Sequence, residues 1–194
     1  YQVTGIDRSE SMLNQARLNK SGLEKEYKKN LEFCRSDITA LQLDTRFDVV
    51  CSLFHVISYQ VSNREISETF KSVSKHLVNG GLFIFDVWYG PGVLTSKPEY
   101  RKNTYKDSNS EITRIANPEI LPDKNIVKVA YKLLLEDGKN EINEDHYMRY
   151  FFTPEIEMFL DNFGMKILEI YDGYTSKKVS DNTWSAIFIA TRQE

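Results

Sequence analysis

Three polar segments of this 194-residue sequence stand where apolar, strand-like segments end, and their residue types suit nucleotide binding. Asp7 follows segment 2–6, Asp37 follows segment 31–36, and residues 52–59 overlap the end of segment 47–53. A carboxylate can accept hydrogen bonds from both hydroxyls of a ribose, which favours Asp7 as a ribose ligand. Asp37 can accept the amino group of an adenine, with the backbone N–H of Ile38 meeting a ring nitrogen.

Each of these two aspartates also has a plainer interpretation. Aspartate is favoured at the start of a helix, so Asp7 alternatively caps the helix that follows it. Aspartate is common in turns because its side chain bonds to nearby backbone, so Asp37 is alternatively a turn residue. Both alternatives stay open from the sequence alone.

The elements that must position these residues alternate between strand and helix over the first 95 residues. This alternation predicts a parallel sheet with crossover helices, whose strands end at one common edge where ligands bind. The predicted strands are 2–6, 31–36, 47–53 and 82–88, and the predicted helices are 9–23, capped by Ser9 or Ser11, and 64–77, stopped by Asn79, Gly80 and Gly81.

A different pattern follows from residue 90. Residues 90–122 are polar and rich in turn residues, whereas 126–136 and 142–152 alternate like antiparallel strands joined by a hairpin turn at 136–140. Thr153 and Pro154 are typical of a helix start, and Gly164 of its end. The final strands are predicted at 166–171 and 184–192, the last one entering the sheet antiparallel.

Composition excludes several function classes. A net charge of −3 gives no basic field for nucleic acid, and no apolar run is long enough to cross a bilayer. The two cysteines and three histidines lack metal-ligand spacing. Gly90, Pro91 and Gly92 follow a strand but do not predict a phosphate loop, because Pro91 has no N–H and no helix pattern opens there. We therefore expect a cytoplasmic protein without a bound metal.

Four motifs in order give the chain a family resemblance. They are Val3-Thr-Gly-Ile-Asp-Arg-Ser9, Cys34-Arg-Ser-Asp-Ile38, Phe47-Asp-Val-Val-Cys51 and Leu77-Val-Asn-Gly-Gly-Leu-Phe-Ile-Phe-Asp86. Together they resemble class I S-adenosylmethionine-dependent methyltransferases, which implies a Rossmann-like α/β sheet and S-adenosylmethionine as cofactor. The resemblance implies that the ribose lies at Ile6 and Asp7, the adenine at Asp37 and Ile38, and the methionine portion at Ser52, Leu53 and Phe54.

A finer resemblance points to small-molecule methyltransferases that modify amino sugars. It rests on Cys51-Ser-Leu-Phe-His-Val-Ile-Ser-Tyr59, Asp86-Val-Trp-Tyr-Gly-Pro-Gly-Val-Leu94 and His146-Tyr-Met-Arg-Tyr-Phe-Phe152. It implies a methyltransferase core at 1–95 and 153–194, and an antiparallel insert at 96–152 that roofs the substrate pocket. It also implies that Tyr59 faces the substrate nitrogen.

Methyl transfer needs little acid–base chemistry from the protein, because the cofactor carries the activated methyl group. An amine nucleophile must be neutral, so we predict Tyr59 or His55 as the group that accepts or relays a proton. The alternatives are a buried tyrosine with a satisfied hydroxyl and a hydrogen-bonded wall histidine.

Three further residues are predicted to contact the substrate. Trp88 and Tyr89 end a strand, and their faces suit a sulfonium or ammonium cation, although an aromatic core fits them equally. Arg149 would bind an anionic substrate group, with an ordinary surface arginine as the alternative. We expect a small-molecule methyl acceptor as partner, no nucleic acid and no membrane, and a homodimer stays open.

The N-terminal end of the sequence shapes the competing hypotheses. The strand ending at Asp7 resembles the second strand of the family, so we expect the first strand, first helix and glycine-rich loop upstream of Tyr1. Without that strand, a gap is expected between the strands ending at Asp7 and Leu53, leaving exposed hydrogen-bonding edges. The alternatives to an enzyme of this class are a non-catalytic domain with a binding or regulatory role and, more weakly, a nicotinamide dehydrogenase.

Overall fold

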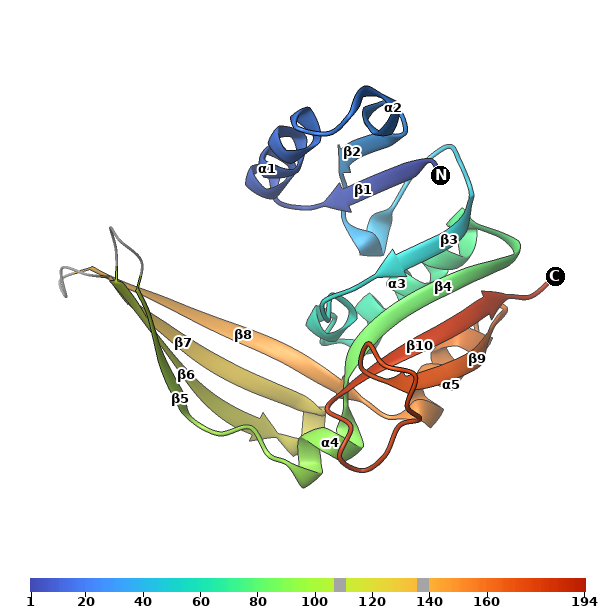
Figure 1. Cartoon of the computed structure of the whole chain (residues 1–194). Helices are drawn as coiled ribbons and strands as arrows, with labels where there is room; N and C mark the ends of the chain where they lie inside the picture. Colours follow the sequence, from blue (N-terminus) through green and yellow to red (C-terminus); the bar gives the residue numbers. More distant parts are fainter. Residues whose placement is uncertain (107–110, 136–139) are drawn as a thin grey trace.

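Two sheets and the helices that cover them make up the fold (Figure 1). This computed structural model describes residues 1–106, 111–135 and 140–194. The smaller sheet pairs β1 (Val3–Asp7) and β2 (Leu31–Arg35) in parallel. The larger sheet has eight strands in the order β5-β6-β7-β8-β4-β10-β9, and β3 (Phe47–Ser52) pairs with β4 (Leu77–Tyr89).

The small sheet is bordered by α1 (Glu10–Ser21) and the short α2 (Lys25–Lys28). The hydroxyl of Ser9 accepts the N–H of Met12, so the predicted cap at Ser9 is confirmed. Only Leu13 of α1 is buried, which makes this the lightly packed end of the molecule. No strand in the described part of the chain pairs with both β1 and β3, so the expected gap between these strands is present.

Helix α3 (Asn63–His76) connects β3 to β4 and packs on the larger sheet. Ser62 and Glu65 form a capping box at its start, and Ile66, Phe70 and Val73 are its buried face. The predicted helix stop at residues 79–81 is wrong, because α3 ends at His76 and β4 begins at Leu77. Gly80, with φ of +75°, lies instead where the register between β3 and β4 shifts.

Helix α4 (Gly90–Thr95) begins at the Gly90-Pro91-Gly92 segment, where we expected a turn and no helix. Pro91 occupies the first turn, where the missing N–H costs nothing. Gly92 is required by packing, since a Cβ there would lie 1.9 Å from the carbonyl oxygen of Thr183. The weak helical signal arises because two of the six residues are glycines.

An antiparallel arm follows, formed by β5 (Arg101–Lys106), β6 (Glu111–Leu121), β7 (Ile126–Leu135) and β8 (Glu141–Phe151). The 3-10 turn η3 (Pro122–Lys124) joins β6 to β7. The expectation of turns over 90–122 is wrong, because β5 and β6 occupy much of this segment. Strand β5 is exposed along its whole length, so its sequence does not alternate between apolar and polar residues. The strands predicted at 126–136 and 142–152 are confirmed, and residues 136–139 of the predicted hairpin turn lie outside the described residues.

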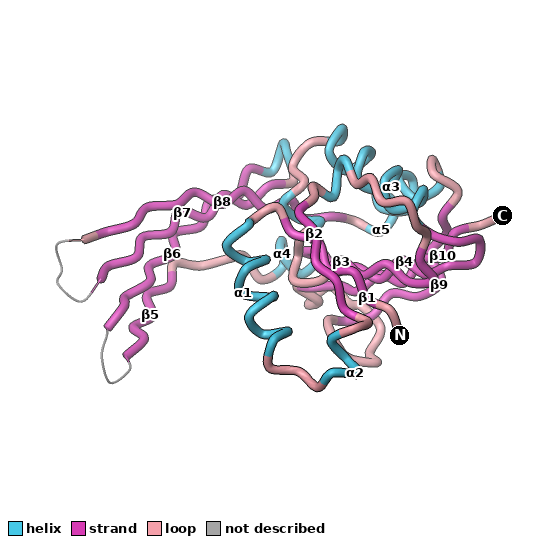
Figure 2. The backbone as a smooth tube through the Cα atoms, turned by 90° about the horizontal axis from the view of Figure 1, so that it is seen from above, coloured by secondary structure: helices cyan, strands magenta, loops and turns pink. Residues whose placement is uncertain are grey.

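The arm projects from the rest of the molecule but shares its sheet (Figure 2). Strand β4 continues beyond β3 and pairs in parallel with β8, Trp88 opposite Tyr150 and Tyr89 opposite Phe151. The long strand β4 therefore ties the arm to the core through backbone hydrogen bonds.

The C-terminal part completes the core. Helix α5 (Thr153–Asp161) follows Phe152 at the cap position, one residue before the predicted cap at Thr153, and it ends before Gly164. Strands β9 (Met165–Asp172) and β10 (Ser185–Arg192) pair antiparallel, and β10 also pairs antiparallel with β4, as predicted.

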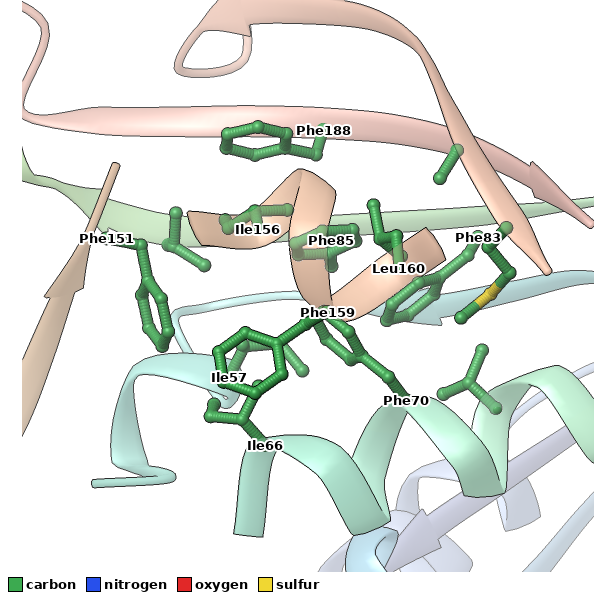
Figure 3. Packing of buried hydrophobic residues seen from close by; sticks show 14 of the residues in the cluster. Ile57, Ile66, Phe70, Phe83, Phe85, Phe151, Ile156, Phe159, Leu160 and Phe188 are labelled. Atoms are coloured by element: carbon green, nitrogen blue, oxygen red, sulfur yellow. The ribbon is translucent and has the colours of Figure 1, made fainter. Parts of the chain in front are cut away.

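Aromatic side chains fill the space between the larger sheet and helices α3 and α5, which lie on the same face of it (Figures 2 and 3). Phe83 and Phe85 of β4 stack at 4.4 Å, and Phe85 stacks on Phe188 of β10 at 5.3 Å. Phe70 of α3 meets Phe85 at 5.5 Å and Phe159 of α5 at 6.3 Å. Each buried phenylalanine stabilises the fold by roughly 1.5–3 kcal/mol, so the ends of β3 and β4 rest on a rigid platform.

Candidate functional site

The carboxyl ends of β1 and β3 point to the same side of the molecule, the side from which the arm projects (Figure 1). Three segments come after the strands β1, β2 and β3. They are the loop after β1, the 3-10 turn η1 (Ile38–Ala40) after β2, and the 3-10 turn η2 (Ile57–Tyr59) after β3. The predicted site residues all lie in or beside these strands and turns, on β4, or on the arm.

Asp7 is exposed at the end of β1. Its Oδ1 accepts the N–H of Ser9 at 2.8 Å, a turn contact just before the helix, whereas the cap of α1 is Ser9 itself. The second oxygen of Asp7 has no partner within the described residues, so this contact leaves it able to accept a ligand hydroxyl. Ile6, just before it in β1, is half-buried.

Asp37 lies next to Asp7, because the N–H of Ser36 bonds to the carbonyl oxygen of Asp7 at 3.1 Å. Asp37 Oδ1 accepts both the N–H and the hydroxyl of Thr39, at 2.9 and 2.7 Å, so it also serves as a turn residue. The backbone N–H and then the hydroxyl of Thr39 hold the pKa of this carboxyl below its ordinary value. Ile38 begins η1 and is half-buried.

The end of β3 carries an unusual backbone. Phe54 and His55 have φ of +63° and +64°, the left-handed region that side chains other than glycine rarely adopt. The Phe54 side chain is 80% exposed, so burial does not explain its conformation. Two consecutive left-handed residues store strain, and such strain concentrates at functional sites. Ser52, two residues earlier, is buried with no hydrogen-bond partner for its Oγ among the described residues, and the half-buried Leu53 lies between them.

A buried carboxylate holds this turn in place. Asp86 of β4 has an exposed fraction of 0% and accepts the backbone N–H of His55 at 2.9 Å. His55 Nδ1 lies 3.0 Å from Asp86 Oδ2, out of line for a directed hydrogen bond, and the Tyr174 hydroxyl donates to the same oxygen at 3.1 Å. Burial would raise the pKa of Asp86, but the contacts with His55 and Tyr174 outweigh it and lower the pKa.

Tyr59 links the core to the arm. Its hydroxyl lies 2.9 Å from Nδ1 of His146 on β8, and its ring meets the imidazole edge-on at 5.8 Å. Tyr59 is 45% exposed, which contradicts the alternative of a buried tyrosine. Burial of its other half, together with Tyr131, raises the pKa of the phenol above its ordinary value.

The remaining predicted substrate residues separate into two groups. Trp88 meets His55 edge-on at 6.4 Å, so it lies beside the strained turn at the end of β3. Tyr89 is buried in the core, with its hydroxyl 3.1 Å from that of Thr153. Arg149 is buried as well, with its guanidinium paired to Glu155 and lying 5.2 Å from the Phe151 ring. Tyr89 and Arg149 thus both have partners within the protein, and their roles as substrate contacts stay predictions.

Sequence reasoning missed four residues of this region, which are Asp86, Tyr174, Glu144 and His146. Asp86 had a usable signal, since it is a single carboxylate after four apolar residues of a buried strand and needs a compensating partner. The other three lie in polar segments where charged and aromatic residues are common. His146 pairs with Tyr59, and Tyr174 with Asp86, across more than 80 residues of sequence.

Comparisons with known proteins agree on one class. Residues 1–81 match the family model of a methyltransferase domain. The putative methyltransferase YqeM of Bacillus subtilis (strain 168) is 25% identical over 197 residues, covering 100% of this chain and 76% of that protein. No helix in the described ranges is long and apolar enough to span a membrane.

Solved structures match the whole chain. A S-adenosylmethionine-dependent methyltransferase from Clostridium acetobutylicum ATCC 824 superposes with a TM-score of 0.79 at 23% identity, covering 100% of this chain and 76% of that one. CalS10, an amino pentose methyltransferase from Micromonospora echinaspora solved with S-adenosylmethionine bound, gives a TM-score of 0.73 at 17% identity, covering 99% and 74%. These structures show that the fold is the Rossmann-like fold of class I methyltransferases, as predicted.

The residues at the strand ends fit S-adenosylmethionine. The free carboxylate oxygen of Asp7 suits a ribose hydroxyl. The hydroxyl of Ser52 is buried without a hydrogen-bond partner among the described residues, and a ligand can supply that partner. The exposed ring of Phe54 offers an aromatic face to a sulfonium cation. This fit agrees with the similarity of residues 1–81 to a methyltransferase domain and supports S-adenosylmethionine as the cofactor.

Proposed function

We propose that the protein transfers a methyl group from S-adenosylmethionine to the nitrogen of a small molecule, an amino sugar or another amine. One observation carries this proposal: the ends of β1 and β3, with Asp7 and the strained Phe54–His55 turn, lie on the side of the molecule where Tyr59 bonds to the arm. A cofactor held at the strand ends would thus lie between the core and the arm.

On the cofactor side, Ile6 and Asp7 would hold the ribose, and Asp37 and Ile38 the adenine. Ser52, Leu53 and Phe54 would line the methionine portion. When bound, S-adenosylmethionine supplies a methyl group already activated by its sulfonium charge. The chain then needs only to hold the acceptor nitrogen in line and keep it neutral.

On the acceptor side, Tyr59 and His55 are the two groups that could handle a proton. Their surroundings differ. His55 is held at the buried Asp86, whereas Tyr59 is 45% exposed and its hydroxyl bonds to His146. Trp88 beside His55 would provide an aromatic wall for an ammonium group. The arm, residues 96–152, would act as the substrate cap over the core at 1–95 and 153–194.

An amine acceptor is supported by CalS10, whose substrate is an amino pentose, because the fold match covers 99% of this chain and includes the arm. A match at 17% identity shows a shared fold, and the methyl acceptor of this protein must be identified by experiment. We also propose, from composition, a cytoplasmic location, with a homodimer to be checked by light scattering.

Calorimetry with S-adenosylmethionine and S-adenosylhomocysteine tests the cofactor. We expect binding, and a loss of about 1–3 kcal/mol of binding free energy for Asp7→Ala, since this removes a hydrogen-bonded charge. Asp44→Ala is the matched control, because Asp44 is exposed before the amino end of β3, at the opposite edge. No binding of either compound would overturn the proposal, and an unchanged affinity of the Asp7 variant would leave Asp7 as a turn residue that bonds to Ser9.

A screen of nucleotide-linked amino sugars and small amines tests the reaction. Mass spectrometry should detect a gain of one methyl group on an amine nitrogen. Cofactor binding without turnover on any acceptor would favour a non-catalytic domain that uses the same pocket for regulation.

A further inference from the structure

Three side chains form a continuous line from the core onto the arm. The hydroxyl of Tyr59, on η2, lies 2.9 Å from Nδ1 of His146. Nε2 of the same imidazole lies 3.2 Å from Oε2 of Glu144, two residues earlier on β8. The line thus runs from a half-exposed phenol beside the proposed acceptor pocket to a carboxylate that is 56% exposed to solvent.

The chemistry of the two ends sets the direction of the hydrogen bonds. An ionised carboxylate only accepts, so Nε2 of His146 must carry the hydrogen that it donates to Glu144. A neutral imidazole with its hydrogen on Nε2 has a bare Nδ1, which accepts the hydrogen of the Tyr59 hydroxyl. The lone pairs of the Tyr59 oxygen stay available for a donor from the pocket.

The strand register shows what else faces these groups. Tyr131 of β7 stands opposite Glu144, and its ring meets the His146 imidazole edge-on at 5.0 Å. Arg114 of β6 lies over the Tyr131 ring at 4.3 Å. Among the described residues, Glu144 is the carboxylate and Arg114 the fixed cation at this cluster. The opposite face of the arm carries the separate pair of Lys128 and Asp145.

We propose that Tyr59, His146 and Glu144 form a proton relay that takes the proton released by the acceptor amine. The proposal deepens the function proposed above and rests on it. Tyr59 is the catalytic residue, because it touches the acceptor nitrogen, and His146 and Glu144 act through it. No such role follows from the sequence, since His146 lies 87 residues from Tyr59.

An N–H bond of the protonated amine breaks with its electron pair staying on nitrogen, and a new O–H bond forms at Tyr59. The former hydroxyl hydrogen of Tyr59 passes to Nδ1 of His146, whose positive charge is balanced by Glu144. His146 then releases its proton from Nε2 to Glu144 or to water, which leaves the neutral imidazole with its hydrogen on Nδ1. Loss of that hydrogen to water and uptake of another at Nε2 restore the starting state, and no oxidant or reductant is needed.

Solvent access favours this line over His55. Glu144 is exposed, so a proton that reaches it exchanges with water. The side chain of Asp86 is 1% exposed, so a proton passed from His55 toward Asp86 would have no exit there. The relay therefore lies on the arm, and His55 serves the turn that carries Phe54.

The first experiment needs only the protein. Long-range ¹H–¹⁵N correlation of the imidazoles, assigned through His146→Asn, should show His146 with its hydrogen on Nε2 and a bare Nδ1. In Tyr59→Phe the resonance of Nδ1 should shift, whereas Asp145→Asn, on the opposite face one residue away, should leave it in place. A hydrogen on Nδ1 would overturn the relay, because the imidazole could not then accept from Tyr59.

The second experiment uses an amine that turns over. We expect kcat of His146→Asn to fall about 100-fold, as for loss of a general base, with KM and S-adenosylhomocysteine affinity unchanged. Activity should recover as pH rises and solvent takes the proton. Asparagine keeps a hydrogen-bond acceptor near the place of Nδ1. If His146 only held Tyr59 in position, kcat of the variant would therefore be unchanged, and that result would overturn the relay.

The two proposals fail separately. Absence of turnover on every acceptor counts against the methyltransferase function, while the imidazole tautomer still decides the relay geometry. Circular dichroism checks that each variant folds. If His146→Asn does not fold, Glu144→Gln provides a second variant for the rate measurements. An unchanged kcat in Glu144→Gln, with a folded protein, counts against Glu144 as part of the line.

Discussion

The molecule contains two histidine–carboxylate pairs beside the same proposed pocket, and they differ in burial. Asp86 on β4 is fully buried and holds His55 by its backbone N–H and its ring. Glu144 on β8 is 56% exposed, and its hydrogen-bond partner among the described residues is the imidazole of His146. The same residue types thus occupy a rigid core position in one pair and a solvent-accessible arm position in the other.

The difference teaches what burial does to a carboxylate. A buried charge must be compensated, so Asp86 accepts two hydrogen bonds, from the His55 N–H and the Tyr174 hydroxyl, lies 3.0 Å from the His55 ring nitrogen, and fixes the backbone around it. An exposed carboxylate has water as a partner and can exchange protons with it. Asp86 therefore shapes the site, whereas Glu144 can take part in a proton transfer.

Removal of the buried carboxylate should have the largest effect. Asp86→Ala leaves the N–H of His55 and the hydroxyl of Tyr174 without their partner, so we expect the free energy of unfolding to fall by about 3–5 kcal/mol. Urea denaturation measures it. The control is Asp145→Ala, an exposed pair with Lys128, which should cost less than about 1 kcal/mol. Equal losses in the two variants would contradict the contrast between buried and exposed pairs.

Acid should expose the same contrast. The pKa of Asp86 is lowered in the folded state, so its contribution to stability is fully present above the ordinary aspartate pKa and is lost as pH falls through the lower, folded value. Denaturation curves from pH 6 to about pH 3 should therefore be flatter for Asp86→Asn than for the wild type. If the free energy of unfolding of Asp86→Asn fell with pH as steeply as that of the wild type, protonation of Asp86 would not be a cause of the loss of stability in acid.

The exposed pair should matter for turnover more than for stability. Tyr59→Phe removes one partly exposed hydrogen bond, so we expect a loss of about 1 kcal/mol or less in the free energy of unfolding. Cofactor affinity should stay the same while kcat falls about 100-fold. Denaturation, calorimetry and rate measurements on one preparation provide the comparison. A defect confined to cofactor binding would argue against a substrate-facing Tyr59.

The smallest change in stability is expected at the strained turn that Asp86 holds. In Phe54→Gly, relief of about 1–2 kcal/mol of left-handed strain offsets the backbone entropy of glycine, about 0.5–1 kcal/mol. We expect unfolding free energy to change by about 1 kcal/mol or less, with weaker cofactor binding. Val56→Gly, at an ordinary φ of −56°, is the control and should destabilise. Clear destabilisation by Phe54→Gly would mean that the turn is not strained.

Local patterns predicted most of the elements. The spacing of Ile66, Phe70 and Val73 predicted α3, and the apolar segments predicted strands within one or two residues of β1, β2 and β3. β4 was predicted from residue 82 although it begins at Leu77. The exposed strand β5 was missed, because a strand without a buried face carries no alternation to detect.

By itself the sequence determined the order of the strands and helices outside residues 90–122, because periodicity and caps are properties of neighbouring residues. It also determined that Asp7, Asp37 and Tyr59 lie at strand ends or in the turns after them. Only the tertiary structure decided the partners. Arg149, predicted to bind an anionic substrate group or else to lie on the surface, is buried against Glu155. Tyr59 meets a histidine on a strand that reaches the core through β4. Such pairings depend on packing between distant segments, and that packing decides which charge is buried and which can exchange protons with water.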